Sequence, residues 1–148
     1  VFTKYGVLSE REVHSRYEIG LEQYVLAVAV EARSVLEIGS TMILPAAVRY
    51  QTELAANVAA LKAAGVEADT AALVDISGLI TSLRASLATL GKGLAHEGDD
   101  DLLTESIHYR DTLLPAMLEV RAAADALEAV VADDLWPLPT YQEMLFML

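Results

Sequence analysis

The sequence predicts an all-α fold, an antiparallel bundle of three to four long helices followed by a short C-terminal helix. Alanine and leucine, which lead the helix-propensity scale, make up much of the 54% hydrophobic content. Only four prolines and eight glycines interrupt the 148 residues. Apolar residues recur at alternating spacings of three and four, as in packed helices. The length fits one domain, so residues 1–148 are expected to fold as a single helical unit.

The first predicted helix begins after Ser9, which can cap it while Glu12 completes a capping box. Pro45 lies inside the helical pattern and should kink or break the helix near Thr41. The segment should end at Gly65 in a Schellman-type stop. Its apolar seam consists of Leu21, Val28, Val35 and Met42 before the proline, and of Val48, Leu54, Val58 and Leu61 after it.

A second helix is predicted to open at Asp69 and to occupy the centre of the bundle, because its seam is the least interrupted. That seam is Leu73, Ile76, Ile80, Leu83, Leu87, Leu90 and Leu94. The turn His96-Glu97-Gly98 follows it.

A third helix should start after Asp99-Asp100-Asp101 and end at Leu135, with a second kink at Pro115. Its seam is Leu113, Met117, Val120, Ala124, Leu127 and Val131. Thr140 and Glu143 form a second capping box that opens a short helix through Met147. The apolar residues of this tail, from Trp136 onward, are expected to dock on a surface.

Short turns between long helices require antiparallel neighbours. The first segment is much longer than the other two. Either its N-terminal half therefore projects toward something else, or the break at Pro45 creates a fourth bundle helix.

The net charge of −12 argues against nucleic acid and against an anionic membrane surface, because both require clustered Lys and Arg. The absence of cysteine excludes disulfides and thiolate metal sites, and it fits a cytoplasmic protein. The longest run without a charge, Ile38 to Val48, is too short to span a bilayer. No signal peptide is evident, and the initial Val1 suggests a fragment of a longer chain.

Glu105-x-x-His108 has the spacing of half a di-iron carboxylate site, but His14 and His96 lack the matching glutamate. Asp99-Asp100-Asp101 lacks the spacing of a calcium loop and is better explained as a helix cap. Gly91-Lys92-Gly93 lacks the context of a phosphate loop and is interpreted as a frayed helix end. No catalytic triad can be assembled, and four tyrosines at helical spacings are expected in the core or an interface: Tyr17, Tyr24, Tyr50 and Tyr109.

Several motifs together resemble the C-terminal region of type III glutamine synthetases, and they keep their order along the chain. They are Lys4-Tyr5-Gly6-Val7-Leu8-Ser9, Ser15-Arg16-Tyr17-Glu18, Ile43-Leu44-Pro45-Ala46 with Tyr50-Gln51, Leu114-Pro115-Ala116-Met117, and Leu135-Trp136-Pro137-Leu138-Pro139-Thr140-Tyr141 with Leu145-Phe146. The stretch from Glu53 to Glu105 carries little of the resemblance, and Gly20 stands where a bulky residue is expected.

The resemblance implies a parent enzyme that joins ammonia to glutamate with ATP and Mg²⁺ or Mn²⁺, in a cytoplasmic homo-oligomer. The family's metal and nucleotide residues lie upstream of this region, so no catalytic, cofactor-binding or metal residue is assigned here. The chain is then a structural or assembly domain whose partners are the upstream ligase domain and neighbouring subunits. The alternatives are a stand-alone helical dimerisation module and a ferritin-like metal bundle.

Overall fold

The computed structural model describes residues 1–96, 101–139 and 141–145. Within these residues every regular element is helical, which confirms the predicted all-α class. In chain order the elements are α1 (Glu10–Ile38), η1 (Gly39–Ile43), α2 (Leu44–Ala63), α3 (Ala71–Leu94), α4 (Leu102–His108), η2 (Tyr109–Leu113), α5 (Leu114–Glu128), η3 (Asp133–Leu135) and α6 (Tyr141–Leu145). The segments η1 and η2 are π-helical, and η3 is a 3₁₀ turn.

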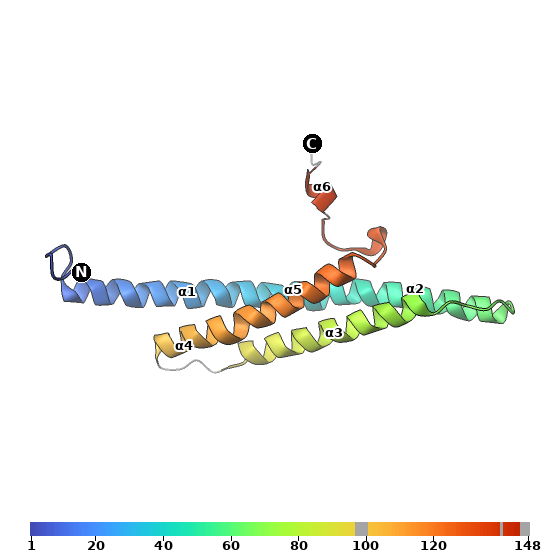
Figure 1. The fold of residues 1–148 in the computed structure, drawn as a ribbon, viewed down its shortest axis with the longest axis horizontal. Coiled ribbons are helices and arrows are strands. Elements are labelled where there is room, and N and C mark those ends of the chain that lie inside the picture. Colours follow the sequence, from blue (N-terminus) through green and yellow to red (C-terminus); the bar gives the residue numbers. More distant parts are fainter. Residues whose placement is uncertain (97–100, 140, 146–148) are drawn as a thin grey trace.

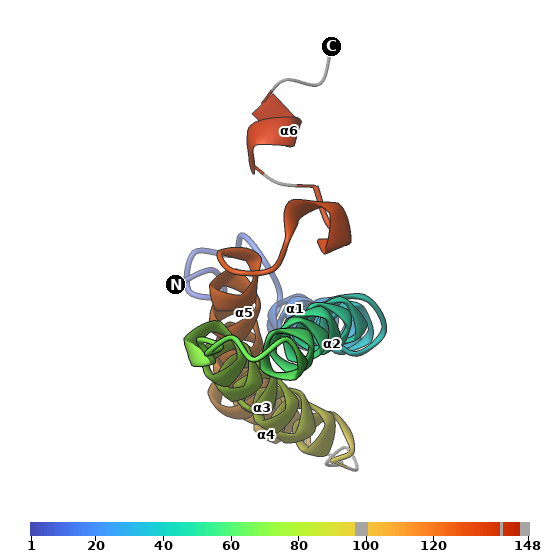
Figure 2. The same ribbon diagram turned by 90° about the vertical axis from the view of Figure 1, so that its right-hand side faces the viewer.

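The helices form three antiparallel rods. The rod α1–η1–α2 runs the full length of the molecule, α3 returns beside α2, and α4–η2–α5 runs back beside both (Figure 1). Viewed end-on, the rods pack around a common axis, and α6 stands away from them (Figure 2). The start of α1 extends past the other rods and the rest of α1 packs among them, so of the two predicted arrangements the projecting one is present, over a shorter stretch than predicted.

The sequence predicted a kink or break at each of the two internal prolines, but the helices continue through both. A π-helical turn precedes each proline. The N–H of Leu44 bonds to the carbonyl of Gly39, and the N–H of Leu114 bonds to that of Tyr109. A proline ring clashes with the carbonyl four residues back, and a wider turn relieves that clash. The rod α1–η1–α2 therefore continues through Pro45 in one line (Figure 1).

The π turn also moves the buried face by one residue. Met42, the predicted seam position, is 37% exposed, whereas Ile43 is 4% exposed. A π turn holds one more residue than an α turn, so the residue after the expected one reaches the core. The assignment of Met42 to the core was wrong for this reason.

The predicted helix ends are confirmed at both termini of the first rod. The backbone N–H of Ser9 donates to Glu12 Oε2 at 2.8 Å, and the Glu12 N–H donates to Ser9 Oγ at 3.3 Å. At the other end Gly65 has a φ of 76°, and the Val66 N–H donates to the Leu61 carbonyl at 3.0 Å. This is the hydrogen bond of a Schellman motif.

The core lies along α3, as predicted. Ile76, Ile80, Leu83, Leu87 and Leu90 are buried, and α3 packs on both α2 and α5. Among the described residues α3 is also the one helix whose length and composition would allow it to cross a membrane, a test that the core helix of a soluble bundle passes as well.

Helix α5 ends at Glu128 rather than at the predicted Leu135. The chain turns at Ala132, where ψ is 137°, and this turn brings Leu135 and Trp136 back onto the core. A straight helix would carry both side chains away from the bundle. The predicted cap at Thr140 and the predicted helix residues after Leu145 lie outside the described residues.

Candidate functional site

The Glu105-x-x-His108 motif lies where the end of α3 meets the start of the third rod. His108 Nε2 is 3.1 Å from the carbonyl oxygen of Gly93, and the His108 ring stacks on His96 with centroids 4.2 Å apart. His108 is thus held by α3 rather than directed with Glu105 toward a shared ligand. Among the described residues no group of three or more His, Asp or Glu side chains converges as a metal site would require.

Asp101 caps α4, which agrees with the capping interpretation of the acidic run. Its carboxylate accepts hydrogen bonds from the Thr104 hydroxyl at 2.7 Å and from the Thr104 N–H at 3.1 Å. These bonds hold the pKa of Asp101 below its usual value, because they favour the charged carboxylate. Asp99 and Asp100 lie outside the described residues.

The Asp101 cap should make the start of α4 acid-sensitive. Because the folded pKa is depressed, its stabilising contribution is present above the unfolded pKa and is lost as the pH falls through the folded value. Asp101→Asn keeps an acceptor but cannot titrate, so its melting-temperature deficit relative to wild type should shrink between pH 6 and pH 3. Asp133→Asn, at an exposed site outside this cap, is the control. A deficit independent of pH would contradict the assignment.

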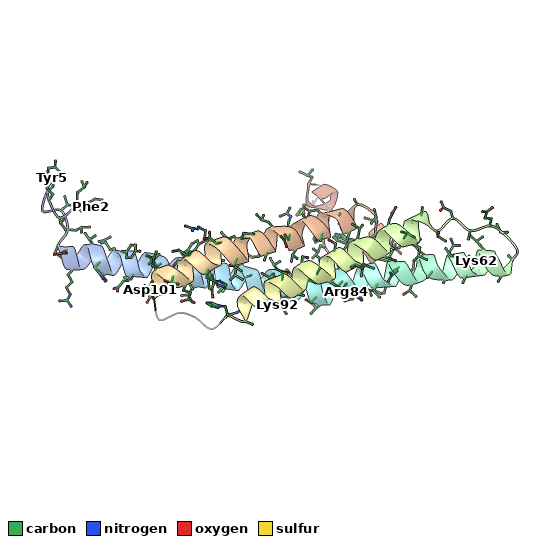
Figure 3. All side chains as sticks on the ribbon, turned by 60° about the horizontal axis from the view of Figure 1, so that its bottom comes forward. Phe2, Tyr5, Lys62, Arg84, Lys92 and Asp101 are labelled. Carbon is green, nitrogen blue, oxygen red and sulfur yellow. The ribbon has the colours of Figure 1, made fainter. Side chains whose placement is uncertain are left out.

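Gly91-Lys92-Gly93 is helical, so the phosphate-loop alternative finds no loop here, and the expected fraying is also absent because α3 continues to Leu94. Gly93 is buried, and a Cβ at this position would lie 2.8 Å from Cδ2 of Leu113. The glycine therefore permits close contact between α3 and η2. Lys92 points away from the bundle (Figure 3).

The tyrosines divide into two groups. Tyr24, Tyr50 and Tyr109 are half-buried against the core, as predicted. Tyr17, which lies on the projecting part of α1, is 51% exposed. An interface remains the better explanation for Tyr17, because a half-exposed aromatic ring contributes little to its own bundle.

A groove of about 380 Å³ lies between the tail and the rods. Its walls are largely apolar and include Ile38, Gly39, Val120, Trp136, Leu138 and Met144. Trp136 and Leu138 pack against the core, so the first part of the tail docks as predicted. The indole N–H of Trp136 is fully buried and has no partner among the described residues, so a molecule in the open groove could not reach it.

The end of α1 carries an exposed apolar surface that the sequence reasoning did not identify. Phe2 is 57% and Tyr5 74% exposed, and both lie in the segment that precedes the first turn of α1 (Figure 3). Heptad counting could not find them because they precede the helix. Across the described residues the arrangement thus offers packing surfaces rather than clustered reactive groups.

These features define a class, an all-α antiparallel domain with a projecting first helix. Comparison with known proteins then finds a matching family. Residues 1–62 match the family described as "Glutamine synthetase C-terminal domain", a region that includes α1, η1 and nearly all of α2. This match, together with the similarity to glutamine synthetases described next, confirms the resemblance seen in the motifs of the chain.

Three relatives resemble nearly the whole chain. A glutamine synthetase of Butyrivibrio fibrisolvens is 32% identical over 100% of it, and one of Bacteroides fragilis (strain YCH46) is 29% identical over 95%. A type-3 glutamine synthetase of Dictyostelium discoideum is 28% identical over 99%. The aligned regions span only 20–22% of these relatives, so the chain corresponds to about a fifth of each.

Proposed function

We propose that this chain is the C-terminal structural and assembly domain of a glutamine synthetase, whose parent enzyme joins ammonia to glutamate with ATP. The observation that carries the proposal is similarity along the whole chain to glutamine synthetases that are about five times longer. The parent would be a cytoplasmic homo-oligomer, and the upstream ligase region and neighbouring subunits would be the partners. The charge of −12 and the lack of cysteine are consistent with this setting.

The chemistry of the parent is assigned to residues outside this chain. ATP and divalent metal require converging carboxylates, imidazoles or phosphate-binding loops. The described residues supply one histidine pair, an aspartate cap and a helical Gly-Lys-Gly segment, and none of these is such a site. We therefore propose that the chain contributes shape and contacts to the parent enzyme.

The isolated chain is expected to make no glutamine and to bind neither ATP nor Mn²⁺ tightly. Titration calorimetry with Mn²⁺ and ATP, at protein concentrations of tens of micromolar, should give only heats of dilution. The full parent protein is the positive control and should bind both. A stoichiometric micromolar ATP site in the isolated chain would contradict the assignment.

The main alternative is a stand-alone helical dimerisation module, which the exposed apolar residues of α1 and α6 favour. The reading frame upstream of Val1 separates the two proposals. A ligase-sized region there, together with glutamine synthesis by the complete protein, supports the first. A short reading frame that encodes a concentration-dependent dimer supports the second.

A further inference from the structure

The first 20 residues, here called the α1 tip, form the most exposed part of the first rod. All of them are exposed except Leu8 and Val13, which are half-buried. No other rod lies beside this part of α1 in either side view (Figures 1 and 3). A single helix of this length is marginal in water, so its order in the functional protein needs a packing partner.

One face of the tip continues the buried seam of α1. Val13, Tyr17, Gly20 and Tyr24 follow at spacings of four, three and four, which places them on one side of the helix. Tyr24 packs against the bundle core. The same face therefore passes from a covered region to an uncovered one without changing its apolar character.

No contact among the described residues requires a glycine at position 20. It has a right-handed helical conformation, and a Cβ built at this position meets nothing within 4 Å. Glycine inside a helix costs about 1 kcal/mol relative to alanine. At Gly39 and Gly93 that cost accompanies close contact with neighbouring side chains. At Gly20, as at Gly78, no described residue makes the corresponding contact.

The tip also differs from the rest of the chain in aromatic content and charge. Phe2, Tyr5 and Tyr17 are each more than half exposed. Half-buried aromatic side chains in the rest of the described chain are Tyr24, Tyr50, Tyr109 and Trp136. Three basic and three acidic residues balance within the tip, so the net charge of −12 resides elsewhere. Aromatic enrichment is typical of interfaces, and the balanced charge means that the tip lacks the net repulsion of the acidic remainder.

We propose that the α1 tip docks, through its Tyr17–Gly20 face, on an apolar surface of the ligase region that precedes it in the parent protein. This inference rests on the proposed function, in which the preceding chain joins at Val1. Val1 lies at the tip (Figure 1), so the ligase region would begin directly beside the uncovered face. The absent side chain of Gly20 would let that surface approach the helix backbone closely.

A second copy of this chain fits the face less well. A stable dimer buries about 1,200 Å² or more, whereas the uncovered part of the helix is only about 15–20 Å long. A contact within one polypeptide can be smaller, because the covalent link gives a high effective concentration. The neighbouring part of the same protein is therefore the favoured occupant.

Hydrogen exchange tests the proposal on the complete parent protein and on the isolated chain. Amides from Glu10 to Gly20 should exchange at least tenfold more slowly in the parent, while amides at the far end of α2, near Lys62, should be unchanged. In the isolated chain the tip should exchange at one rate at all protein concentrations. Protection that grows with concentration would identify a second copy as the occupant and overturn the proposal, as would equal exchange in chain and parent.

Two substitutions on the docking face and one matched control sharpen the test. Tyr17→Glu should abolish the added protection in the parent, whereas Ile19→Glu should preserve it, since Ile19 is similarly exposed at 49% but lies on the opposite face. Gly20→Ala should act in opposite directions. It should raise the folding constant of the isolated chain about fivefold through helix propensity and should weaken tip protection in the parent. If Ile19→Glu abolished the protection and Tyr17→Glu did not, docking would occur through the Ile19 side of the helix, which would contradict the proposal.

Glutamine synthesis by the wild-type parent is measured on the same samples. Synthesis without added tip protection rejects the docking and retains the proposed function. Tip protection without synthesis rejects the proposed function and retains the docking on the preceding region.

Discussion

Replacing Leu83 by alanine is expected to destabilise the bundle by about 2–5 kcal/mol. Leu83 is 0% exposed and lies in the middle of α3, which packs on both α2 and α5, so the cavity left by truncation has little room to collapse. Urea unfolding followed by circular dichroism measures the loss as a lower midpoint.

Leu118→Ala is the matched control, because Leu118 is 69% exposed and should lose less than about 0.5 kcal/mol. Leu87, which is 6% exposed, should behave like Leu83. Losses below about 0.5 kcal/mol at both Leu83 and Leu87 would mean that the core has been placed wrongly.

Replacing Gly39 by valine is expected to cost about 1–3 kcal/mol through overpacking. A Cβ at Gly39 would lie 2.7 Å from Cδ2 of Leu87 and 3.6 Å from Cγ1 of Val120, so the added side chain would press on both other rods at once. The effect should appear as a lower urea midpoint with an unchanged slope.

The same change at Gly78 serves as the comparison, because a Cβ there meets nothing within 4 Å. Gly78→Val should alter stability by less than about 0.5 kcal/mol. Equal effects at the two glycines would show that helix propensity, and not the contact with Leu87, determines the result.

The helices and their buried faces were largely predictable, because heptad spacing reports directly which residues share a face. Leu83, Leu90 and Leu127 are all 0% exposed, as their seams predict. The behaviour at Pro45 and Pro115 was not predictable in this way. A proline favours a break in an isolated helix, and packing on both sides of η1 and η2 favours a continuous one. That competition depends on neighbours distant in the sequence.

The candidate groups followed a similar pattern. The Asp101 cap could be predicted from adjacent residues, and the structure contains this cap. The partner of His108 could not, since the carbonyl of Gly93 comes from another helix and approaches only when α3 and α4 pack. The bend at Ala132 likewise depends on where Trp136 finds apolar contact.

The unbroken first rod also has a mechanical consequence. Its uncovered part, from Glu10 to Gly20, spans about 16 Å and acts as a lever arm on the point where α1 enters the bundle, near Tyr24. A bend of about 10° at that point would displace the outer end by about 3 Å, if the arm has that length. Beyond it α1 is packed, with Val25, Val28 and Ala29 buried. Movement of whatever holds the outer end would thus be transmitted into the bundle as torque along one continuous helix.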